Sequence, residues 1–150
     1  MAKIFAQAIN CLNFKDNDEV CEKCDNCIEC ENKTVDIIEI DAASNNGVDQ
    51  IRELKNRINV VPDKLKYKVY IIDEVHMLTV AAFNALLKTL EEPPEHVIFI
   101  LATTDPQKVI PTVMSRCQRF NFSKLSKFEI VQKLKEILEK ENEAYEDEAL

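Results

Sequence analysis

One short apolar stretch constrains this sequence more than any other. Residues 69–72 are β-branched or aromatic without interruption, which predicts a strand buried on both faces. Asp73 and Glu74 follow it directly. Ligands of parallel α/β sheets bind at the carboxyl ends of the strands, so we expect Asp73 to hold a magnesium ion and Glu74 to activate a water molecule. The simpler alternative is a strand followed by a solvated acidic turn.

The rest of the chain alternates between helical and strand-like patterns. Helices are predicted at residues 2–9, 48–60 and 127–140, the last with Ile130, Leu134, Ile137 and Leu138 facing inward, and strands at 35–40, 97–102 and 118–122. A further helix is predicted after Thr79, which we expect to be its N-cap, and before Pro93. Such alternation predicts an α/β fold in three layers, with a parallel sheet covered by helices on both faces. A chain of 150 residues, 46% hydrophobic, supports one good core and is short for two.

Charge and hydropathy narrow the functional classes. No apolar run approaches the roughly 20 residues that cross a bilayer, so we expect no membrane association and a cytoplasmic location. The net charge of -8 is concentrated at the carboxyl end, where residues 136–150 hold seven acids and one lysine. The remainder is close to neutral and offers no broad basic field for nucleic acid.

Five of the six cysteines lie between residues 11 and 30. Cys21, Cys24, Cys27 and Cys30 follow one another at every third position, with Cys11 upstream. Without a secretion signal, this spacing favours a metal site over disulfides. Zinc is the favoured metal, and because it takes four thiolates, one of the five is surplus. An iron–sulfur cluster and a set of unmetallated core thiols are the alternatives.

The chain contains a single glycine, Gly47, which we expect to cap a helix. A loop that cradles the phosphates of a nucleoside triphosphate needs several glycines ahead of a lysine and a hydroxyl. No such loop occurs within these 150 residues.

Several longer motifs carry a family resemblance. They are Ile40-Asp41-Ala42-Ala43-Ser44, Ile72-Asp73-Glu74-Val75-His76-Met77-Leu78, residues 83–95, residues 102–108 and Ser115-Arg116-Cys117. With these motifs the chain resembles the gamma/tau subunit family of bacterial DNA polymerase III, the motor subunits of the clamp loader and members of the AAA+ ATPases. The resemblance runs through essentially the whole chain.

The resemblance implies roles for individual residues. Asp73 and Glu74 would be the Walker B pair that handles Mg-ATP, and Thr104 would be the sensor 1 residue near the γ-phosphate. Arg116 would be an arginine finger that enters the ATP site of a neighbouring subunit. The family's zinc ligands would correspond to Cys11, Cys21, Cys24 and Cys27. Read without the family, Thr104 is an ordinary strand-end hydroxyl and Arg116 a surface cation at a helix end.

The same resemblance implies an incomplete nucleotide-binding core. Residues 1–140 would form a partial AAA+ core of the P-loop NTPase type with an inserted zinc module at 11–30, and residues 141–150 would begin the helical lid. The family's first strand and Walker A loop have no counterpart here. We therefore expect weak ATP binding by this chain alone. We also expect an open slot in the sheet, closed by pairing of the strands that end near Thr103 and Phe122, by strand exchange or by self-association.

The resemblance also implies partners in the parent assembly, namely the other clamp-loader subunits, a sliding clamp and primed DNA. Two alternatives remain at this point. One is a non-catalytic stator of the delta-prime type, which would have no need of the Asp73–Glu74 pair. The other is a free-standing zinc-dependent interaction module, which the missing phosphate loop would favour.

Overall fold

The computed structural model describes residues 1–14, 19–32 and 34–141. It divides into two compact units, Met1–Gln118 and Arg119–Leu150. The first unit contains the sheet, the cysteine cluster and every residue to which the sequence assigns a catalytic role.

The first unit is built on a parallel sheet of three strands in the order β1-β2-β3. The strands are β1 (Ile37–Asp41), β2 (Lys68–Asp73) and β3 (Val97–Leu101). As predicted, β2 is buried on both faces, because it lies between the other two strands and its residues Val69, Tyr70 and Ile72 have no exposed surface. An unbroken apolar sequence is what such a doubly covered strand requires.

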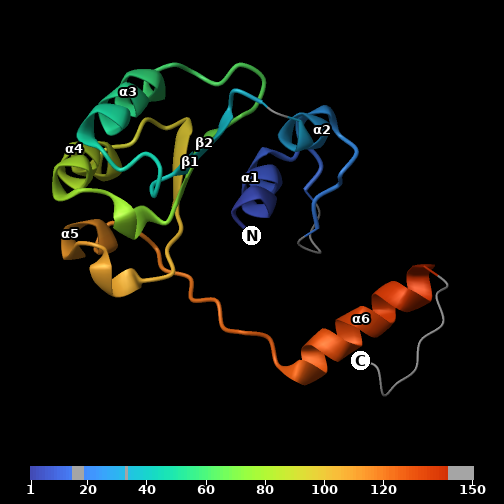
Figure 1. Ribbon diagram of the computed structural model, residues 1–150. Helices are drawn as coiled ribbons and strands as arrows, with labels where there is room; N and C mark the ends of the chain where they lie inside the picture. The colour runs from blue at the N-terminus through green and yellow to red at the C-terminus, as the bar shows by residue number, and fades with distance from the viewer. Residues whose placement is uncertain (15–18, 33, 142–150) are drawn as a thin grey trace. The chain divides into compact units, whose positions relative to one another are not determined.

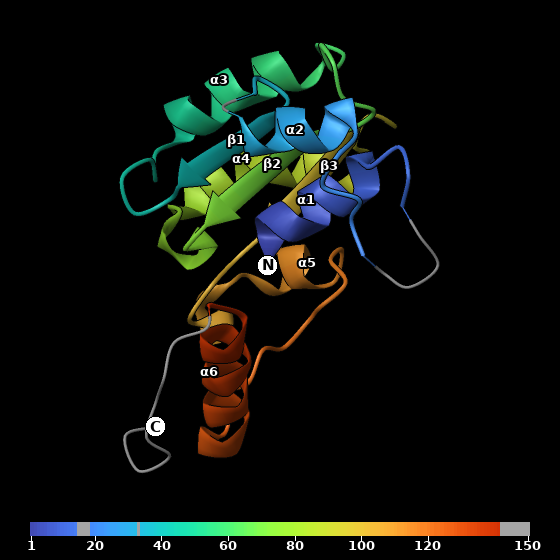
Figure 2. The same ribbon diagram turned by 90° about the vertical axis from the view of Figure 1, so that its right-hand side faces the viewer.

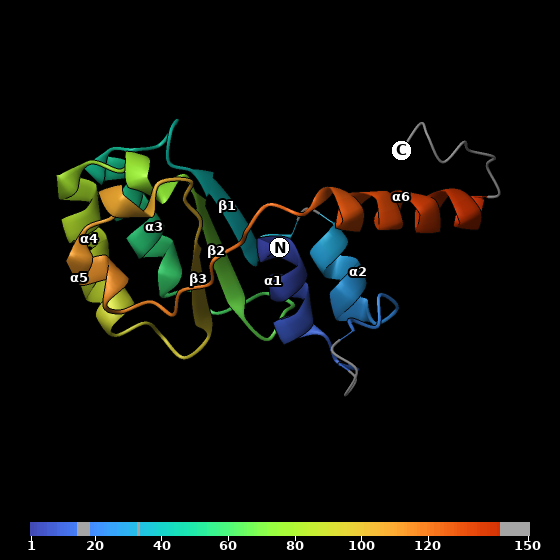
Figure 3. The same ribbon diagram turned by 90° about the horizontal axis from the view of Figure 1, so that it is seen from below.

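Helices cover both faces of this sheet, which confirms the predicted α/β architecture in layers (Figures 1 and 3). The helices α3 (Val48–Ile58) and α4 (Val80–Glu91) pack against each other on one face, and the short α5 (Pro111–Met114) lies beside α4. On the opposite face lies α1 (Ala2–Asn10), with α2 (Asp25–Glu31) packed against it.

The larger core lies between the sheet and α3 and α4. Its fully buried large side chains include Ile51 and Ile58 from α3, Phe83 and Leu86 from α4, and Tyr70 from β2, whose ring stacks on Phe99 at a centroid distance of 5.5 Å. The smaller core joins α1 to the other face of the sheet through Ala6, Val69 and Ile71.

A buried carboxylate fastens the loop before β2 to the start of β1. Asp36 is fully buried, and its side chain accepts hydrogen bonds of 2.8–3.0 Å from the backbone amides of Asp63, Lys64 and Leu65. Burial alone would raise the pKa of Asp36, but the amides of Lys64, Asp63 and Leu65 outweigh it and hold the pKa below its ordinary value. The ionised form of Asp36 is therefore part of the native structure.

The second unit contains a single helix in its described residues, α6 (Lys127–Glu141). Within this unit its apolar residues are not covered, since Ile130, Leu134 and Ile137 are 40–46% exposed and Leu138 is only partly buried, and their inward packing stays a prediction. The reason is that the rest of the described unit is an irregular segment, which offers α6 no helix or strand of its own unit to pack against. The prediction for residues 141–150 lies, apart from the end of α6, outside the described residues.

The predicted strand at 118–122 is also absent, and these residues are irregular. Alternation of polar and apolar side chains places Phe120 and Phe122 on one side, but a strand also needs a neighbour to bond with its backbone. Among the described residues, β3 pairs with β2 alone, and the closure of the slot by pairing, strand exchange or self-association stays a prediction. Within the same described residues, every helix falls short of the length and apolar character needed to cross a membrane.

The Asp36 anchor yields a pH-dependent prediction. Asp36→Asn removes the charge but keeps the shape, so we expect it to lower the free energy of unfolding at pH 7 by about 1–3 kcal/mol. Because the folded pKa of Asp36 is depressed, its stabilisation is fully present above the ordinary aspartate pKa and is lost as pH falls through the folded value. The difference between the variant and the unaltered protein should therefore shrink below about pH 4.

Urea unfolding followed by circular dichroism between pH 2.5 and 7 measures this difference. Asp49→Asn is the matched control, because its side chain is 84% exposed and pairs only with Arg52 on the helix surface. A difference between Asp36→Asn and the unaltered protein that stays constant down to pH 2.5 would rule out an ionised anchor.

Candidate functional site at the carboxyl ends of the strands

The carboxyl ends of the strands are joined by backbone hydrogen bonds that continue past the sheet. Asp41 and Asp73 are register partners, and the amide of Ala42 donates to the carbonyl of Asp73 at 3.0 Å. On the other side of β2, the amide of Ala102 donates to Ile72 and the amide of Val75 donates to Ala102, both at 2.9 Å. The turn after β2 is therefore fixed to the turn after β3.

This arrangement brings Glu74 and Thr104 into direct contact. The hydroxyl of Thr104 donates to the Glu74 carboxylate at 2.9 Å, and the amide of Thr104 donates to it at 3.2 Å. Glu74 adopts a left-handed backbone conformation with φ of 47°, which turns its side chain away from the direction of the strand. Two residues 30 positions apart, both assigned to the site from the sequence, thus share one hydrogen-bonded group.

His76 belongs to the same group, although the sequence patterns gave it no role in the site. Its side chain is 10% exposed, and its Nδ1 lies 3.2 Å from the Glu74 carboxylate and 2.9 Å from the hydroxyl of Thr103. The available signal was local: His76 stands two residues after Glu74, in the tight turn Val75–Met77.

Asp73 and Asp41 differ in what their carboxylates do. The Asp73 side chain is exposed, and its Oδ1 accepts from the amide of Glu74 at 2.9 Å. Asp41 accepts from the hydroxyl of Ser44 and the amide of Ala43, and these two bonds hold the pKa of Asp41 below its ordinary value. Asp41 therefore stabilises the turn before α3, whereas Asp73 keeps an oxygen directed to solvent and suited to a hydrated magnesium ion.

The amino end of α1 lies at this same edge of the sheet. At the opposite end of α1, the buried side chain of Asn10 accepts from the amide of Tyr67 at 2.8 Å and donates to its carbonyl at 3.3 Å, just before β2 begins. Ala6 packs on Val69 and Ile71 in the middle of β2. The helix therefore runs antiparallel to β2, as Figure 2 shows, so its first turn points toward the edge that carries Asp73.

Arg116 makes its contacts elsewhere. It follows α5, and its guanidinium donates to the carbonyl of Thr112 at 2.6 Å and forms an ion pair with the carboxylate of Glu91, the last residue of α4. The family resemblance implies that Arg116 is a site residue, but its contacts are with Thr112 and Glu91 rather than with Asp73, Glu74 or Thr104.

The cysteines form a second, separate site. The Sγ atoms of Cys11, Cys21, Cys24 and Cys27 all lie within 4.8 Å of one another, with Cys11 to Cys21 at 3.5 Å and Cys21 to Cys27 at 3.8 Å. Tetrahedral zinc with Zn–S bonds of about 2.3 Å places its sulfurs about 3.8 Å apart. The four thiols therefore fit a single tetrahedral metal ion with little movement.

The other two cysteines stand apart from this cluster. Cys30 and Cys117 are not among the four grouped thiols, although Cys30 continues the regular spacing of the sequence. Burial raises the pKa of Cys30 to about 11, so it remains a neutral thiol at pH 7. Within the cluster the pKa shifts differ in direction: the backbone amide of Lys23 lowers the pKa of Cys21 to about 6, whereas burial raises the pKa of Cys27.

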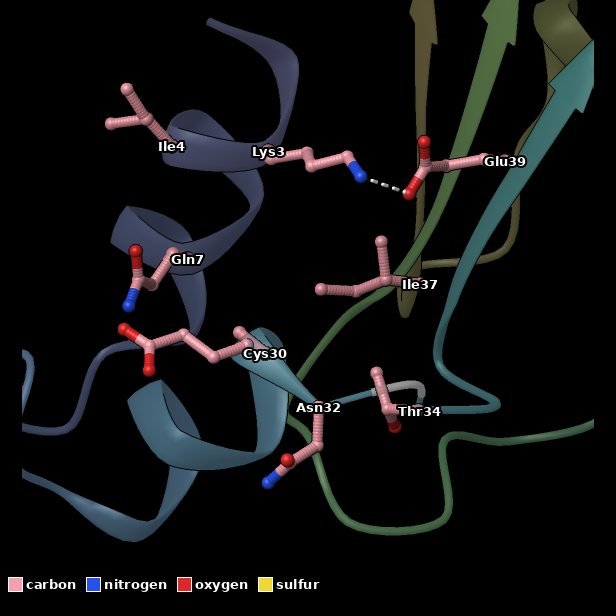
Figure 4. Close-up of a pocket in the computed structure, with 9 residues that line it drawn as sticks. Lys3, Ile4, Gln7, Cys30, Asn32, Thr34, Ile37 and Glu39 are labelled. Atoms are coloured by element: carbon pink, nitrogen blue, oxygen red, sulfur yellow. Dashed lines mark ion pairs between the residues drawn. The ribbon is translucent and has the colours of Figure 1, made fainter.

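A groove of about 540 Å³ lies between α1, the end of α2 and the edge strand β1 (Figure 4). Lys3 reaches across it to form an ion pair of 2.7 Å with Glu39. The side chain of Gln7 also lines it, and its buried Nε2 has no hydrogen-bond partner. None of the residues predicted for the two sites lines this groove.

Comparisons with known proteins agree with the resemblance drawn from the motifs. A sequence profile of the family described as "DNA polymerase III, delta subunit" matches residues 1–126. The chain is 53% identical to DNA polymerase III subunit tau of Bacillus subtilis over 99% of its length, and 48% identical to DNA polymerase III subunit tau of Escherichia coli over its whole length. It spans 26% and 23% of those two relatives.

A solved structure is similar as well. The crystal structure of a DNA polymerase III gamma subunit-related protein from Thermotoga maritima superposes with a TM-score of 0.59 at 31% identity, covering 76% of this chain and 41% of that one. Together with the profile match over most of the sequence, these findings show that the chain belongs to the DNA polymerase III subunit family that this profile describes, with gamma and tau subunits as its relatives.

Proposed function

We propose that this chain is part of an ATP-hydrolysing clamp-loader subunit of the gamma/tau type. In that role it would help to place a sliding clamp on primed DNA during replication in the cytoplasm, together with the other clamp-loader subunits. The observation that carries the proposal is the contact of Thr104 with Glu74, directly beside the exposed Asp73, at the carboxyl edge of a parallel sheet. The gamma and tau names of the relatives support it.

Each residue then has a defined task. Asp73 would hold the magnesium ion of Mg-ATP through its solvent-facing oxygen. Bound Mg-ATP would supply the phosphoryl group to be transferred. Glu74 would orient a water molecule and accept its proton, and Thr104 and His76 fix the direction of its carboxylate. Arg116 would act on the nucleotide of a neighbouring subunit, where its planar donors suit a phosphate.

The delta-type description of the matched family favours one alternative, a subunit that does not hydrolyse ATP. The Asp73–Glu74 pair argues against it, because such a subunit has no use for a metal-binding acid followed by a water-activating one. Measurement of ATP turnover distinguishes the two.

The first functional prediction concerns Glu74 in the full-length protein assembled with its partner subunits. Glu74→Gln removes the proton acceptor but keeps the hydrogen bond from Thr104, so ATP turnover should fall roughly 10²-fold or more while ATP binding is retained. Coupled-enzyme assays and nucleotide titration measure the two quantities.

Glu95→Gln serves as the control for Glu74→Gln, because it makes the same change of charge at an exposed position before β3. Turnover that is unaffected by Glu74→Gln, or that is absent from the unaltered assembly, would favour the non-hydrolysing alternative.

The second prediction concerns the 150-residue chain alone. Its one glycine and the absence of a glycine-rich loop ahead of Lys-Thr or Lys-Ser leave it without backbone amides arranged around phosphates. Titration calorimetry should therefore give no measurable heat at micromolar ATP. A saturating signal in that range would contradict this prediction.

The third prediction concerns zinc. We propose that Cys11, Cys21, Cys24 and Cys27 hold one structural zinc ion, which fastens α2 to the end of α1 where little apolar surface is available. Elemental analysis should give one zinc per chain. Cys24→Ser should lower both the zinc content and the thermal midpoint of unfolding.

Cys30→Ser is the matched control for Cys24→Ser, since Cys30 follows the same spacing but lies outside the cluster. Loss of zinc in Cys30→Ser, or retention of iron in the purified protein, would show that the ligand set or the metal is wrong.

A further inference from the structure

The guanidinium of Arg116 is held against its own subunit by both terminal nitrogens. Nη2 pairs with the carboxylate of Glu91, while Nη1 donates to the carbonyl of Thr112 at 2.6 Å and lies 3.5 Å from the hydroxyl of Ser115. These nitrogens carry most of the donors that an arginine offers to a phosphate. In this conformation Arg116 cannot present them to another molecule without breaking the pair with Glu91.

The pair is also exposed enough to open. The side chains of Arg116 and Glu91 are 32% and 46% exposed, so water reaches both partners. An exposed ion pair is only weakly favourable, and a phosphate group of higher negative charge competes well for the same donors. The ion pair with Glu91 therefore orients the guanidinium of Arg116 but is weak enough to be broken by a competing phosphate.

The position of Glu91 separates it from the acidic site of its own subunit. Glu91 ends α4, whereas the turn that carries Glu74 and His76 precedes the start of α4 at Val80. A helix of 12 residues is about 18 Å long. Glu91 therefore restrains an arginine that lies far along α4 from the subunit's own Glu74.

We propose that Glu91 is a positioning residue that holds Arg116 in a withheld conformation and releases it to a triphosphate bound by a neighbouring subunit. The inference rests on the proposed function, in which Arg116 acts on that nucleotide. Glu91 is the residue that controls Arg116: its negative charge neutralises the guanidinium until phosphate oxygens replace the carboxylate. Removal of the charge on Glu91 would free Arg116 before the assembly binds its clamp or DNA.

The test compares Glu91→Gln with Glu92→Gln in the full-length protein. Glu92 is the adjacent residue and is exposed, and the carboxylate that pairs with Arg116 is that of Glu91, so substitution of Glu92 makes the same charge change without opening the pair. The first measurement is the rate at which phenylglyoxal modifies Arg116, followed by peptide mass spectrometry. Glu91→Gln should raise that rate about two- to fivefold, the range that an exposed ion pair accounts for, and Glu92→Gln should leave it unchanged.

The second measurement is ATP turnover by the assembled subunits without clamp or DNA. Glu91→Gln should raise this unstimulated rate by a similar factor, and the gain should disappear when Arg116→Ala is added. A purely structural role for Glu91 would instead change the thermal midpoint of unfolding without making the labelling and the turnover depend on Arg116.

The possible failures point to different causes. Equal labelling of Arg116 in all three proteins overturns the inference, and if Arg116→Ala still abolishes turnover, the proposed function stands. Turnover that does not respond to Arg116→Ala overturns both the role of Arg116 and the inference built on it.

Discussion

The hydrogen-bond ladder on the two sides of β2 is the interaction on which the rest of the structure depends. β2 is the one strand of the described sheet with a partner on each side, and the ladder continues beyond its end through Ala42 and Ala102. A loop residue following an isolated strand could move freely. Here hydrogen bonds to neighbouring strands and turns fix the backbone on either side of Asp73, so Asp73 and Glu74 have a defined orientation. These are main-chain hydrogen bonds, which do not depend on the identity of the side chains as long as the strand is buried.

Side chains add to this frame in two opposite ways. Around Glu74, a carboxylate is directed by neutral donors from Thr104 and by the ring of His76, which leaves its charge available for chemistry. Around Arg116, a cation is bound by an anion and a carbonyl, which uses up its donors. The first arrangement fixes the direction of a carboxylate, whereas the second holds a cation that must leave its partners before it can bind another group.

The fold was largely predictable because burial leaves clear patterns. The unbroken run at Val69–Ile72 identified the central strand, and Thr79 was correctly read as the cap of α4, where its hydroxyl accepts from the amide of Ala82. The failure at residues 118–122 has a clear cause: the alternation describes which side chains share a face, not whether a partner covers that face. Periodicity is a property of the segment, and pairing is a property of the fold.

A candidate site could be predicted from the sequence when its residues lie close together in the chain. The Asp73–Glu74 pair is two adjacent residues, and the cysteines lie close together in the sequence, so both could be found from local patterns. Spacing alone could not decide whether Cys11 or Cys30 is the fourth thiol of the cluster. The contacts of His76 with Thr103 and of Arg116 with Glu91 join residues about 25 positions apart, so they depend on the folded arrangement.

Glu74 occupies a left-handed backbone conformation that a glycine would adopt without strain. The contacts of the Glu74 carboxylate with Thr104 and His76 offset the cost of that conformation, and a glycine in its place would relax the backbone but leave both partners without their carboxylate.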